Sequence, residues 1–148
     1  MIKIIVLGGG CFWGMQDLIR KQEGVVQTTV GYSSGAEVIE IEYDSEKTSY
    51  KKLLDFFFRI HNPTTLNQQG NDRGTSYRSV IFYNDEQEKK EAINFIDIVN
   101  KSERWKNPVV TNLEQFIKFT KAEDYHQDYL EKNPAGYTCH AIRFDSYL

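Results

Sequence analysis

The order of two kinds of apolar pattern constrains the fold more than any single motif. Apolar runs typical of strands fall at residues 2–7, 25–32, 36–43, 77–83 and 108–112. Apolar residues at helical spacing predict helices over residues 14–22, 49–61, 86–101 and 122–131. The first six elements therefore contain two consecutive βαβ units. This order predicts an α+β chain with a ferredoxin-like, two-layer α/β sandwich (a βαββαβ core), followed by a further helix, a strand and a C-terminal tail.

The composition limits the class of protein. The 148 residues are 40% hydrophobic and 26% charged, which suits a single domain spanning 1–148 with a sizeable core. The formal net charge is −3 and Lys and Arg form no dense run, so we expect no nucleic-acid partner. The apolar stretch 4–7 is too short for a signal sequence and no segment reaches membrane-span length. We therefore expect a cytoplasmic protein that does not contact membranes.

The sequence GGGCFWG at residues 8–14 places Cys11 just before the first predicted helix. Glycines let a backbone approach a ligand closely, and the unpaired N–H groups of a helix start favour a thiolate. Phe12 and Trp13 would add an apolar wall beside the sulfur. We therefore expect a nucleophilic sulfur next to a pocket for a methyl or thioether group. The alternative, a buried core cysteine, would need neither the glycines nor the aromatic pair.

Strand alternation selects a carboxyl group for the same site. Counting by two from Glu37 gives Ile39, Ile41 and Tyr43, so Glu37 begins a row that faces inward. A carboxyl group there loses hydration, so its pKa should rise and it becomes a candidate proton donor. Tyr32, on the preceding strand, should point into the same region. A solvated Glu37 at a frayed strand end is the alternative interpretation.

The longest irregular stretch, residues 62–76, is about 15 residues long, and loops of that length inside a compact domain are usually functional. Its short polar side chains hydrogen-bond nearby backbone and hold such a loop in one shape. Asp72 would accept backbone N–H bonds or steady a ring hydroxyl, and Tyr77 would present its phenol to a ligand. A simple turn network is the alternative.

Two cysteines in a reducing compartment are more often catalytic, redox-active or metal-binding than structural. We expect no zinc site, because Cys11 and Cys139 are far apart in the sequence, no CxxC is present and the histidines are isolated. We expect His61 to cap or pack against a helix and His126 to join a hydrogen-bond network. His140 either aids the ionisation of Cys139 or is simply exposed on the tail.

Read together, five segments resemble the methionine sulfoxide reductase A family, in order and over nearly the whole chain. They are GGCFWG (9–14), VGY (30–32) with a following glycine, AEV (36–38), NQQGNDRGTSYRS (67–79) and AEDYHQ (122–127). The resemblance implies an enzyme that reduces methionine-S-sulfoxide, free or in proteins, and so repairs oxidised methionine. By this resemblance Cys11 would attack the sulfoxide sulfur, while Phe12 and Trp13 would cradle the S-methyl group.

The resemblance also implies how the sulfoxide oxygen is handled. Glu37, Tyr32 and Tyr77 would hydrogen-bond this oxygen, and Asp72 would order the polar cluster. A sulfoxide oxygen is a poor leaving group unless it is protonated, so the proton would come from Glu37.

Recycling would use the second cysteine. Attack leaves Cys11 as a sulfenic acid, and a second thiol can condense with it. Cys139 follows a Gly-Tyr pair on a C-terminal segment, where members of the family often place a recycling cysteine. The resemblance thus implies a Cys11–Cys139 disulfide reduced by an external dithiol such as thioredoxin, with no bound cofactor, in a monomer. The alternative is a bystander Cys139 and direct reduction of the sulfenic acid by an external thiol.

Three positions depart from the family pattern. Only residues 33–36 separate Tyr32 from Glu37, where the family usually carries a longer insert ending in His-Ala-Glu. Asn62 stands where aspartate is usual, and Ser76 where glutamine is usual. The short connection bears on substrate breadth and on the placement of Glu37.

Two other functions compete with this interpretation. A cysteine hydrolase or acyltransferase would pair Cys11 with His126 and Asn67, although it leaves the Phe-Trp pair and Glu37 unexplained. A non-catalytic module that binds methionine or its sulfoxide would result if the short connection had removed turnover.

Overall fold

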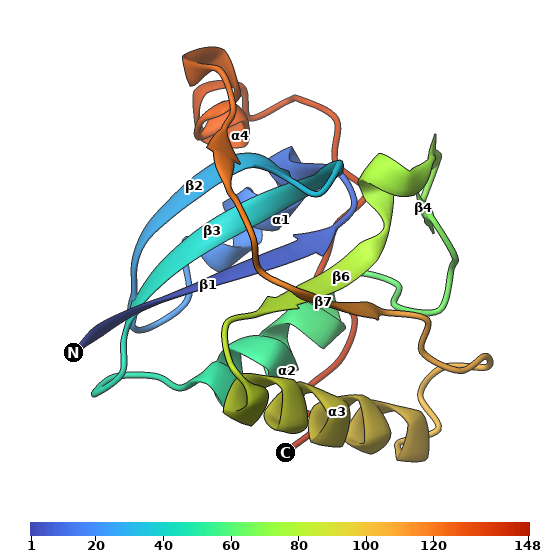
Figure 1. Cartoon of the computed structure of the whole chain (residues 1–148). Helices are drawn as coiled ribbons and strands as arrows, with labels where there is room; N and C mark the ends of the chain where they lie inside the picture. Colours follow the sequence, from blue (N-terminus) through green and yellow to red (C-terminus); the bar gives the residue numbers. More distant parts are fainter.

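The computed structural model describes residues 1–148, and its main sheet has six strands in the order β7-β6-β1-β3-β2-β8 (Figure 1). Neighbouring strands are antiparallel except for β6 and β7, which are parallel. The strands are β1 (Ile2–Gly9), β2 (Val25–Ser33), β3 (Ala36–Asp44), β6 (Ser79–Tyr83), β7 (Asn112–Gln115) and β8 (Thr120–Lys121).

Two helices connect the central strands. Helix α1 (Phe12–Ile19) leads from β1 to β2, and α2 (Tyr50–Ile60) leads from β3 towards β6. The central order β6-β1-β3-β2 and these connections form the βαββαβ core, so the ferredoxin-like prediction is confirmed.

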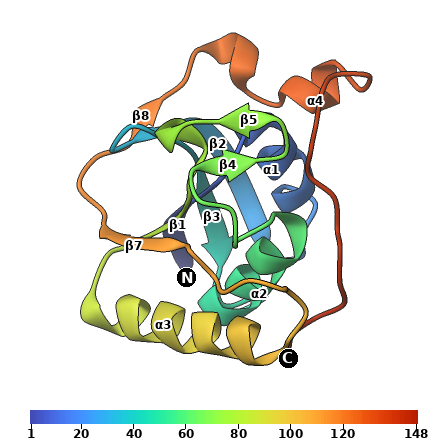
Figure 2. The ribbon, with the colours of Figure 1, turned by 90° about the vertical axis from the view of Figure 1, so that its right-hand side faces the viewer.

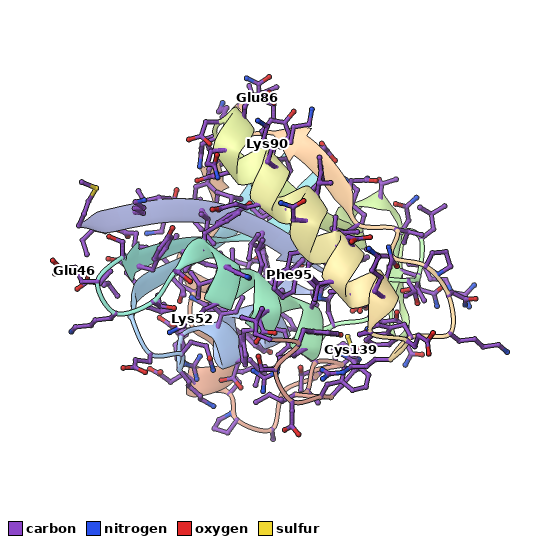
Figure 3. All side chains as sticks on the ribbon, turned by 90° about the horizontal axis from the view of Figure 1, so that it is seen from below. Glu46, Lys52, Glu86, Lys90, Phe95 and Cys139 are labelled. Carbon is purple, nitrogen blue, oxygen red and sulfur yellow. The ribbon has the colours of Figure 1, made fainter.

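The helices cover one face of the sheet. Ile5 and Leu7 of β1 belong to a cluster of 21 buried residues that includes the inner faces of α1, α2 and α3 (Glu86–Lys101). Phe95 of α3 points inward and stacks on Phe58 of α2 with ring centroids 5.8 Å apart, whereas Glu86 and Lys90 point outward (Figure 3). Burying such aromatic and aliphatic side chains contributes about 1.5–3 kcal/mol each.

The other face of the sheet has a smaller core. Val6, Val80 and Phe82 alternate with the residues that face the helices and form part of a five-residue cluster. Phe116 and Phe119 pack against it from the connection between β7 and β8, which crosses this face (Figure 1). The connection thus shields apolar residues that would otherwise face water.

The short connection between β2 and β3 forms a two-residue hairpin turn. Ser34 and Gly35 both have positive φ, 47° and 78°, as type I′ turns require. This turn fixes the register so that Tyr32 lies directly opposite Glu37. The deletion relative to the family pattern therefore leaves these two residues side by side.

Several predicted boundaries differ from the structure, and three of them have a local cause or consequence. Helix α1 begins at Phe12, two residues before the expected start. The strand expected from 77 begins at Ser79, because Thr75–Tyr77 forms a 3₁₀ turn. The strand expected at 108–112 is wrong, since β7 begins only at Asn112: proline has no N–H to donate, and the Val110 N–H bonds the carbonyl of Pro63 instead.

The helix expected over 122–131 is also wrong. This segment contains a 3₁₀ turn, Asp124–His126, and a short helix, α4 (Tyr129–Lys132), separated by Asp128 in a left-handed conformation at φ 53°. The Gln127 side chain accepts from the Val30 N–H and donates to the Val30 carbonyl, both at 2.9 Å. Bonds to a neighbouring strand replace the bonds of a continuous helix.

The polar loop 62–76 contains a two-stranded ribbon, β4 (Gln68–Gln69) and β5 (Asp72–Arg73) (Figure 2). The buried Gln69 amide accepts from the Asn62 N–H at 3.0 Å and donates to the Asn62 carbonyl. These bonds tie the ribbon to the residues that follow α2, beside the start of α1.

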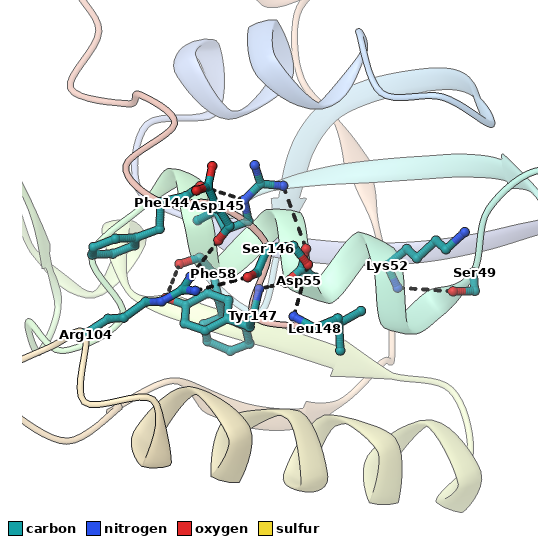
Figure 4. A network of polar contacts seen from close by, with 11 residues as sticks. Ser49, Lys52, Asp55, Phe58, Arg104, Phe144, Asp145, Ser146, Tyr147 and Leu148 are labelled. Atoms are coloured by element: carbon teal, nitrogen blue, oxygen red, sulfur yellow. Dashed lines mark hydrogen bonds and ion pairs between the residues drawn. The ribbon is translucent and has the colours of Figure 1, made fainter.

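Residues 133–148 have no regular structure and return from α4 to the region of α2 and α3 (Figure 2). Their end is held by a polar network (Figure 4). The Tyr147 N–H donates to Asp55 at 2.7 Å, and Arg104 donates to the Ser146 carbonyl at 3.0 Å. No helix of the structure combines the length and apolar character that crossing a membrane requires.

Candidate active site

One pocket of about 250 Å³ brings together seven of the eight residues singled out from the sequence. Its lining residues are Cys11, Phe12, Trp13, Tyr32, Glu37, Asp72, Tyr77, His126 and Tyr137. Cys139 does not line this pocket, while His126 and Tyr137 were not expected there. The AEDYHQ segment and the Gly-Tyr pair before Cys139 were the available signals, but neither indicates which side chains face the pocket.

Cys11 is the residue immediately before the first turn of α1, and the Trp13 N–H lowers the pKa of its thiol. Burial has the opposite and larger effect and, together with the nearby Glu37 and Asp72 carboxylates, raises this pKa to about 12. The expectation that the helix start makes Cys11 a thiolate at rest is therefore wrong. The desolvation of the sulfur outweighs the helix end.

The glycines beside Cys11 serve the packing of the protein itself. A Cβ on Gly10, whose φ is +99°, would lie 2.6 Å from Cγ of Gln69, and one on Gly14 would clash with His140. The space predicted to admit a ligand is therefore occupied by side chains of the polar loop and the C-terminal segment. These contacts hold both segments against the start of α1.

Glu37 is half-buried and points into the pocket, as strand alternation predicts, and the solvated alternative is wrong. One carboxylate oxygen, Oε1, accepts the Phe12 N–H at 3.2 Å. Burial raises the pKa of Glu37 to about 6, despite the opposing effect of that N–H. A carboxyl group in this state carries its proton at a pH much closer to neutrality than an exposed glutamate does.

Three further polar groups surround the carboxyl group. The negative charge of Glu37 raises the pKa of Tyr77, and burial raises that of Tyr32. Both phenols therefore keep their protons and can donate to an oxygen in the pocket. Asp72 Oδ2 is buried without a hydrogen-bond partner. An orphaned buried acceptor is costly, and its position suits a group that acquires a donor when a ligand enters.

The apolar wall of the pocket is built from stacked rings. Phe12 is buried, with its ring centroid 5.6 Å from that of Tyr32 and 5.1 Å from that of His126. Trp13 stacks on Tyr129 with centroids 3.8 Å apart and planes 11° from parallel. A wall of this kind has the shape and polarity that suit a small apolar group, and Cys11 lines the same pocket.

Cys139 and Cys11 are both free thiols in this structure. The Cys139 thiol donates to the carbonyl of Gln69 at a sulfur–oxygen distance of 3.8 Å. It is half-buried beside Gly70, whose added Cβ would lie 2.9 Å from Cβ of Cys139. The second thiol is thus held by the β4–β5 ribbon, outside the pocket.

The three histidines have separate roles. His140 is buried and its Nε2 lies 2.6 Å from the carbonyl of Gly9, so the interpretation as an exposed tail residue is wrong. Burial lowers its pKa to about 4, and its Nδ1 lies 3.9 Å from the Cys139 sulfur. His61 is buried between Phe57 and Ser79 as a packing residue, and His126 belongs to a hydrogen-bond network, both as predicted. No three acidic, histidine or cysteine side chains are grouped to hold a metal ion.

A thiol at a helix start, a carboxyl group with a pKa raised towards neutrality and an apolar wall share one pocket of a ferredoxin-like domain. Together they define a cysteine-dependent enzyme. The profile of the peptide methionine sulfoxide reductase family matches residues 3–37 and 34–146, and the chain belongs to this family. The two matched segments meet at the short β2–β3 turn.

Individual relatives agree with this assignment. The chain is 56% identical to peptide methionine sulfoxide reductase MsrA 2 of Rhodopirellula baltica, covering 97% of this chain and 93% of the relative. Mxr1 of Saccharomyces cerevisiae in reduced form has a similar structure, with a TM-score of 0.91 at 36% identity over 97% of this chain and 93% of that one. Mxr1 in complex with Trx2 gives a TM-score of 0.73 at 30% identity, covering 97% and 91%.

Proposed function

We propose that the protein reduces methionine-S-sulfoxide, free or within proteins, to methionine, and that a thioredoxin-type dithiol restores the enzyme. The observation that carries the proposal is the pocket in which the Cys11 thiol, the Glu37 acid and the ring wall of Phe12 and Trp13 meet. The names of the relatives at more than 50% identity support the same reaction. The proposal includes a cytoplasmic monomer of one domain that repairs oxidised methionine and binds neither nucleic acid nor membranes.

In the first step the Cys11 sulfur attacks the sulfoxide sulfur while Glu37 delivers a proton to the oxygen. This attack forms a bond between the two sulfurs. The protonated oxygen leaves the sulfoxide sulfur as hydroxide and adds to the Cys11 sulfur while the sulfur–sulfur bond breaks, so methionine departs and Cys11 becomes a sulfenic acid. The sulfoxide is reduced by two electrons and the cysteine is oxidised by two. The proton given up by the thiol returns Glu37 to its acid form, so the step balances without a cofactor.

The other groups bind the substrate for this attack. Phe12 and Trp13 enclose the S-methyl group, while Tyr32 and Tyr77 donate to the sulfoxide oxygen and Asp72 orders these hydroxyls. Phe12 also donates its N–H to Glu37 Oε1, which leaves Oε2 of the same carboxyl group for the proton. Donors already aimed at the oxygen stabilise its developing charge without reorganisation during the reaction.

In the second step the Cys139 thiol attacks the sulfenic sulfur, water leaves and a Cys11–Cys139 disulfide forms. An external dithiol then reduces this disulfide and is itself oxidised to a disulfide. Cys139 does not line the pocket, but it lies close enough to Cys11 for its charge to raise the pKa of that thiol.

The hydrolase interpretation requires His126 to act as a general base towards Cys11, and the structure gives it no free ring nitrogen for this. Both ring nitrogens of His126 are engaged, one by Trp13 and the other by Glu123, so neither accepts the Cys11 proton. Release of an acyl product without consumption of reductant would nevertheless contradict the proposed reduction.

The test is a single turnover without recycling reductant. The reduced protein is mixed with excess L-methionine-S-sulfoxide, and the methionine formed and free thiols lost are counted per chain. One methionine with both thiols lost is the expected result. One methionine with one thiol lost would keep the reduction but overturn the role of Cys139. Binding of the sulfoxide with no methionine formed would indicate a non-catalytic binding module.

A further inference from the structure

The Cys139 thiol lies beside a histidine that has no role in the reaction described so far. Its sulfur is 3.8 Å from the Gln69 carbonyl oxygen and 3.9 Å from Nδ1 of His140. A backbone carbonyl oxygen accepts a hydrogen bond but takes up no proton at neutral pH, whereas a neutral imidazole nitrogen can do both. His140 is 7% exposed, so water does not compete for this nitrogen. The pair therefore places a thiol next to a base.

The second ring nitrogen fixes the form of the imidazole. Nε2 of His140 lies 2.6 Å from the Gly9 carbonyl oxygen, which can only accept. The ring proton therefore sits on Nε2, and Nδ1 keeps its lone pair. The backbone N–H of His140 does not occupy that lone pair, because it donates to Oγ1 of Thr138 at 3.1 Å. Nδ1 thus faces the Cys139 sulfur as an acceptor.

The position of this ring ties Cys139 to the start of α1. Gly9 lies two residues before Cys11, and a Cβ on Gly14 would lie 2.3 Å from Nδ1 of His140. The imidazole is therefore packed against backbone on both sides of Cys11. Because Cys139 directly precedes His140, this packing anchors the thiol and the base together beside the residue with which the disulfide is proposed to form.

The protonation states of the pair suit a proton transfer from sulfur to nitrogen. Burial raises the pKa of the Cys139 thiol above its ordinary value, so the group keeps its proton at neutral pH. Burial lowers the pKa of His140 to about 4, so its ring is neutral under the same conditions. Only a thiolate is a good nucleophile, and the resting protein holds a protonated thiol beside an unprotonated base that can create one.

Two neighbouring groups favour the thiolate that such a transfer would create. The other titratable or charged groups near the pair are His61, Asp72, Tyr137 and Arg143. A hydrogen bond from Tyr137 and the charge of Arg143 both lower the pKa of the Cys139 thiol, against the larger effect of burial. Asp72 acts in the opposite direction, and His61 is neutral because burial lowers its pKa to about 3. The negative sulfur would therefore find a hydrogen-bond donor and a cation when its proton leaves.

We propose that His140 is the general base of the disulfide-forming step. As the Cys139 sulfur attacks the sulfenic sulfur of Cys11, its S–H bond breaks and the proton passes to Nδ1. The new sulfur–sulfur bond displaces the oxygen of the sulfenic acid, and the imidazolium returns the same proton to this oxygen, so that water leaves. The Cys11 sulfur is reduced and the Cys139 sulfur is oxidised. The base is restored, and the step balances without a further reactant.

This inference rests on the proposed function, because it requires the sulfenic acid that methionine sulfoxide leaves on Cys11. It adds a residue to the second step, in which the recycling thiol otherwise has no means of losing its proton at neutral pH. The weakness of His140 as a base confines the transfer to the moment at which the sulfur–sulfur bond forms.

The test removes the base while keeping the anchor. In His140→Gln the amide nitrogen lies near the position of Nε2 and can still donate to Gly9, but no atom can take up the proton. The reduced protein is mixed with excess L-methionine-S-sulfoxide at pH 7, and methionine release and disulfide formation are followed in the same samples. We expect disulfide formation to slow about a hundredfold relative to methionine release, the low end of the range for a general base. Sulfenic acid, trapped with dimedone, should accumulate. A ratio within about threefold of wild type would overturn the proposal.

Two further substitutions separate the base from other roles of a buried histidine. In His140→Asn the amide oxygen lies near the position of Nδ1 and accepts a hydrogen bond from the thiol, but it cannot take the proton. Disulfide formation should be slow here too, and recovery of the wild-type ratio would overturn the role as a base. His61→Gln is the matched control, because His61 is also buried and packs against Gly9 while its ring nitrogens contact Phe57 and Ser79. Its ratio should equal that of wild type, and a slowing as large as in His140→Gln would overturn the proposal.

The pH dependence distinguishes a base from a structural residue. Without a base, the reaction needs thiolate that forms spontaneously, and this fraction rises about tenfold per pH unit below the raised pKa of Cys139. His140, with its pKa of about 4, stays neutral over the same range. The gap between wild type and His140→Gln should therefore narrow about tenfold per unit from about pH 6.5 to 8.5, and the comparison cancels the titration of groups that both proteins share. A gap that stays constant with pH would overturn the proposal.

Methionine release separates this inference from the proposed reaction. Absence of methionine with the wild-type protein would contradict the proposed function itself. Methionine release followed by equally fast disulfide formation in wild type and His140→Gln would overturn the role of His140 alone.

A second measurement leaves His140 in place and does not depend on the folding of His140→Gln. In Cys11→Ser the one remaining thiol is Cys139, and its alkylation by iodoacetamide is followed while ultraviolet absorbance reports the thiolate fraction. With His140 as the base, alkylation at about pH 6.5 should be at least about tenfold faster than the thiolate fraction allows. Strict proportionality between the alkylation rate and the thiolate fraction would overturn the proposal.

Discussion

The two cysteines of this protein lie in regions held by different kinds of structure. The sheet fixes Cys11 and the groups around it. Cys11 lies between the end of β1 and the first residue of α1, and the register of β2 and β3 sets Tyr32 beside Glu37. Cys139 lies in a segment without regular structure. Side-chain contacts to the β4–β5 ribbon and the hydrogen bond between His140 and the Gly9 carbonyl hold this segment in place.

The difference matches two demands of the proposed reaction. Proton delivery and sulfur attack need groups fixed in advance, since small displacements weaken both. Disulfide formation needs a thiol outside the pocket that can reach the Cys11 sulfur. Side-chain contacts can break individually, whereas a strand register changes only as a whole.

The largest effect should come from removing the fixed thiol. Cys11→Ser leaves a hydroxyl that neither attacks the sulfoxide nor forms a sulfenic acid, so methionine formation should fall by more than about a thousandfold. The amount of methionine released in a single turnover checks this. Significant methionine formation by a folded Cys11→Ser protein would remove the proposed nucleophile.

Cys139→Ser should separate the two regions most clearly. The variant should still release one methionine per chain at a rate within about twofold of wild type, because the pocket is intact, while losing one thiol. Turnover driven by thioredoxin should fall by more than about tenfold, since no disulfide forms. Recycling at the wild-type rate would mean that an external thiol reduces the sulfenic acid directly.

Glu37→Gln should lower the rate of the first step by about a hundredfold or more, the range for a general acid, and should change its pH dependence. The reactive state needs a protonated Glu37, with a pKa of about 6, and a Cys11 thiolate, with a pKa of about 12. Its population rises with pH up to about 6 and then stays level, because loss of acid is matched by gain of thiolate. Without Glu37 the rate should keep rising through pH 9, and a level profile would contradict the assignment.

The same substitution has a stability control. Burial raises the pKa of Glu37 from 4.5 to about 6, so its ionised form is disfavoured in the folded state. The free energy of unfolding of wild type is therefore lowered as pH rises through this interval. Glu37→Gln should match wild type in thermal unfolding at pH 4 and exceed it at pH 7.5. A lower Tm at pH 7.5 would indicate structural damage instead of a lost acid.

The smallest effect should come from loosening the C-terminal anchor. Arg104 donates to the Ser146 carbonyl and lies 4.4 Å from the ring centroid of Tyr147. Arg104→Ala should lower the free energy of unfolding by about 1–2 kcal/mol and slow disulfide formation, with methionine release unchanged. Lys90→Ala, on the exposed face of α3, is the control and should change neither. Slower methionine release in Arg104→Ala would show that the two regions are not independent.

The periodic spacing of apolar residues in the sequence predicted the main strands and helices and the residues that they place. Period-two alternation identified the inward row that starts at Glu37, and apolar helical spacing identified α2 and α3. Part of the pocket followed as well, because Cys11, Tyr32 and Glu37 stand at or beside the ends of α1, β2 and β3. The helix expected over 122–131 failed because side chains of Gln16 and Gln127 bond distant backbone groups, which local propensity does not encode.

Electrostatic expectations failed for a related reason. The helix start beside Cys11 is visible in the sequence, but the depth at which the thiol is buried is not, and burial determines its pKa. The glycine run was interpreted as space for a ligand, whereas His140 and Gln69, distant in sequence, pack there. Of the two interpretations of His140, the one that placed it exposed on the tail was wrong, since the residue is buried.

The anchored C-terminus has a further consequence for the Cys139 segment. The segment is fixed to the domain at α4, which ends at Lys132, and again where the Arg143 N–H donates to the Arg59 carbonyl at 2.8 Å. Cys139 therefore belongs to a closed loop and explores a small volume. Confinement of this kind gives the Cys139 thiol an effective concentration at Cys11 of about a millimolar or more. A sulfenic acid on Cys11 would therefore react with the Cys139 thiol before a second oxidant molecule could oxidise it irreversibly to the sulfinic acid.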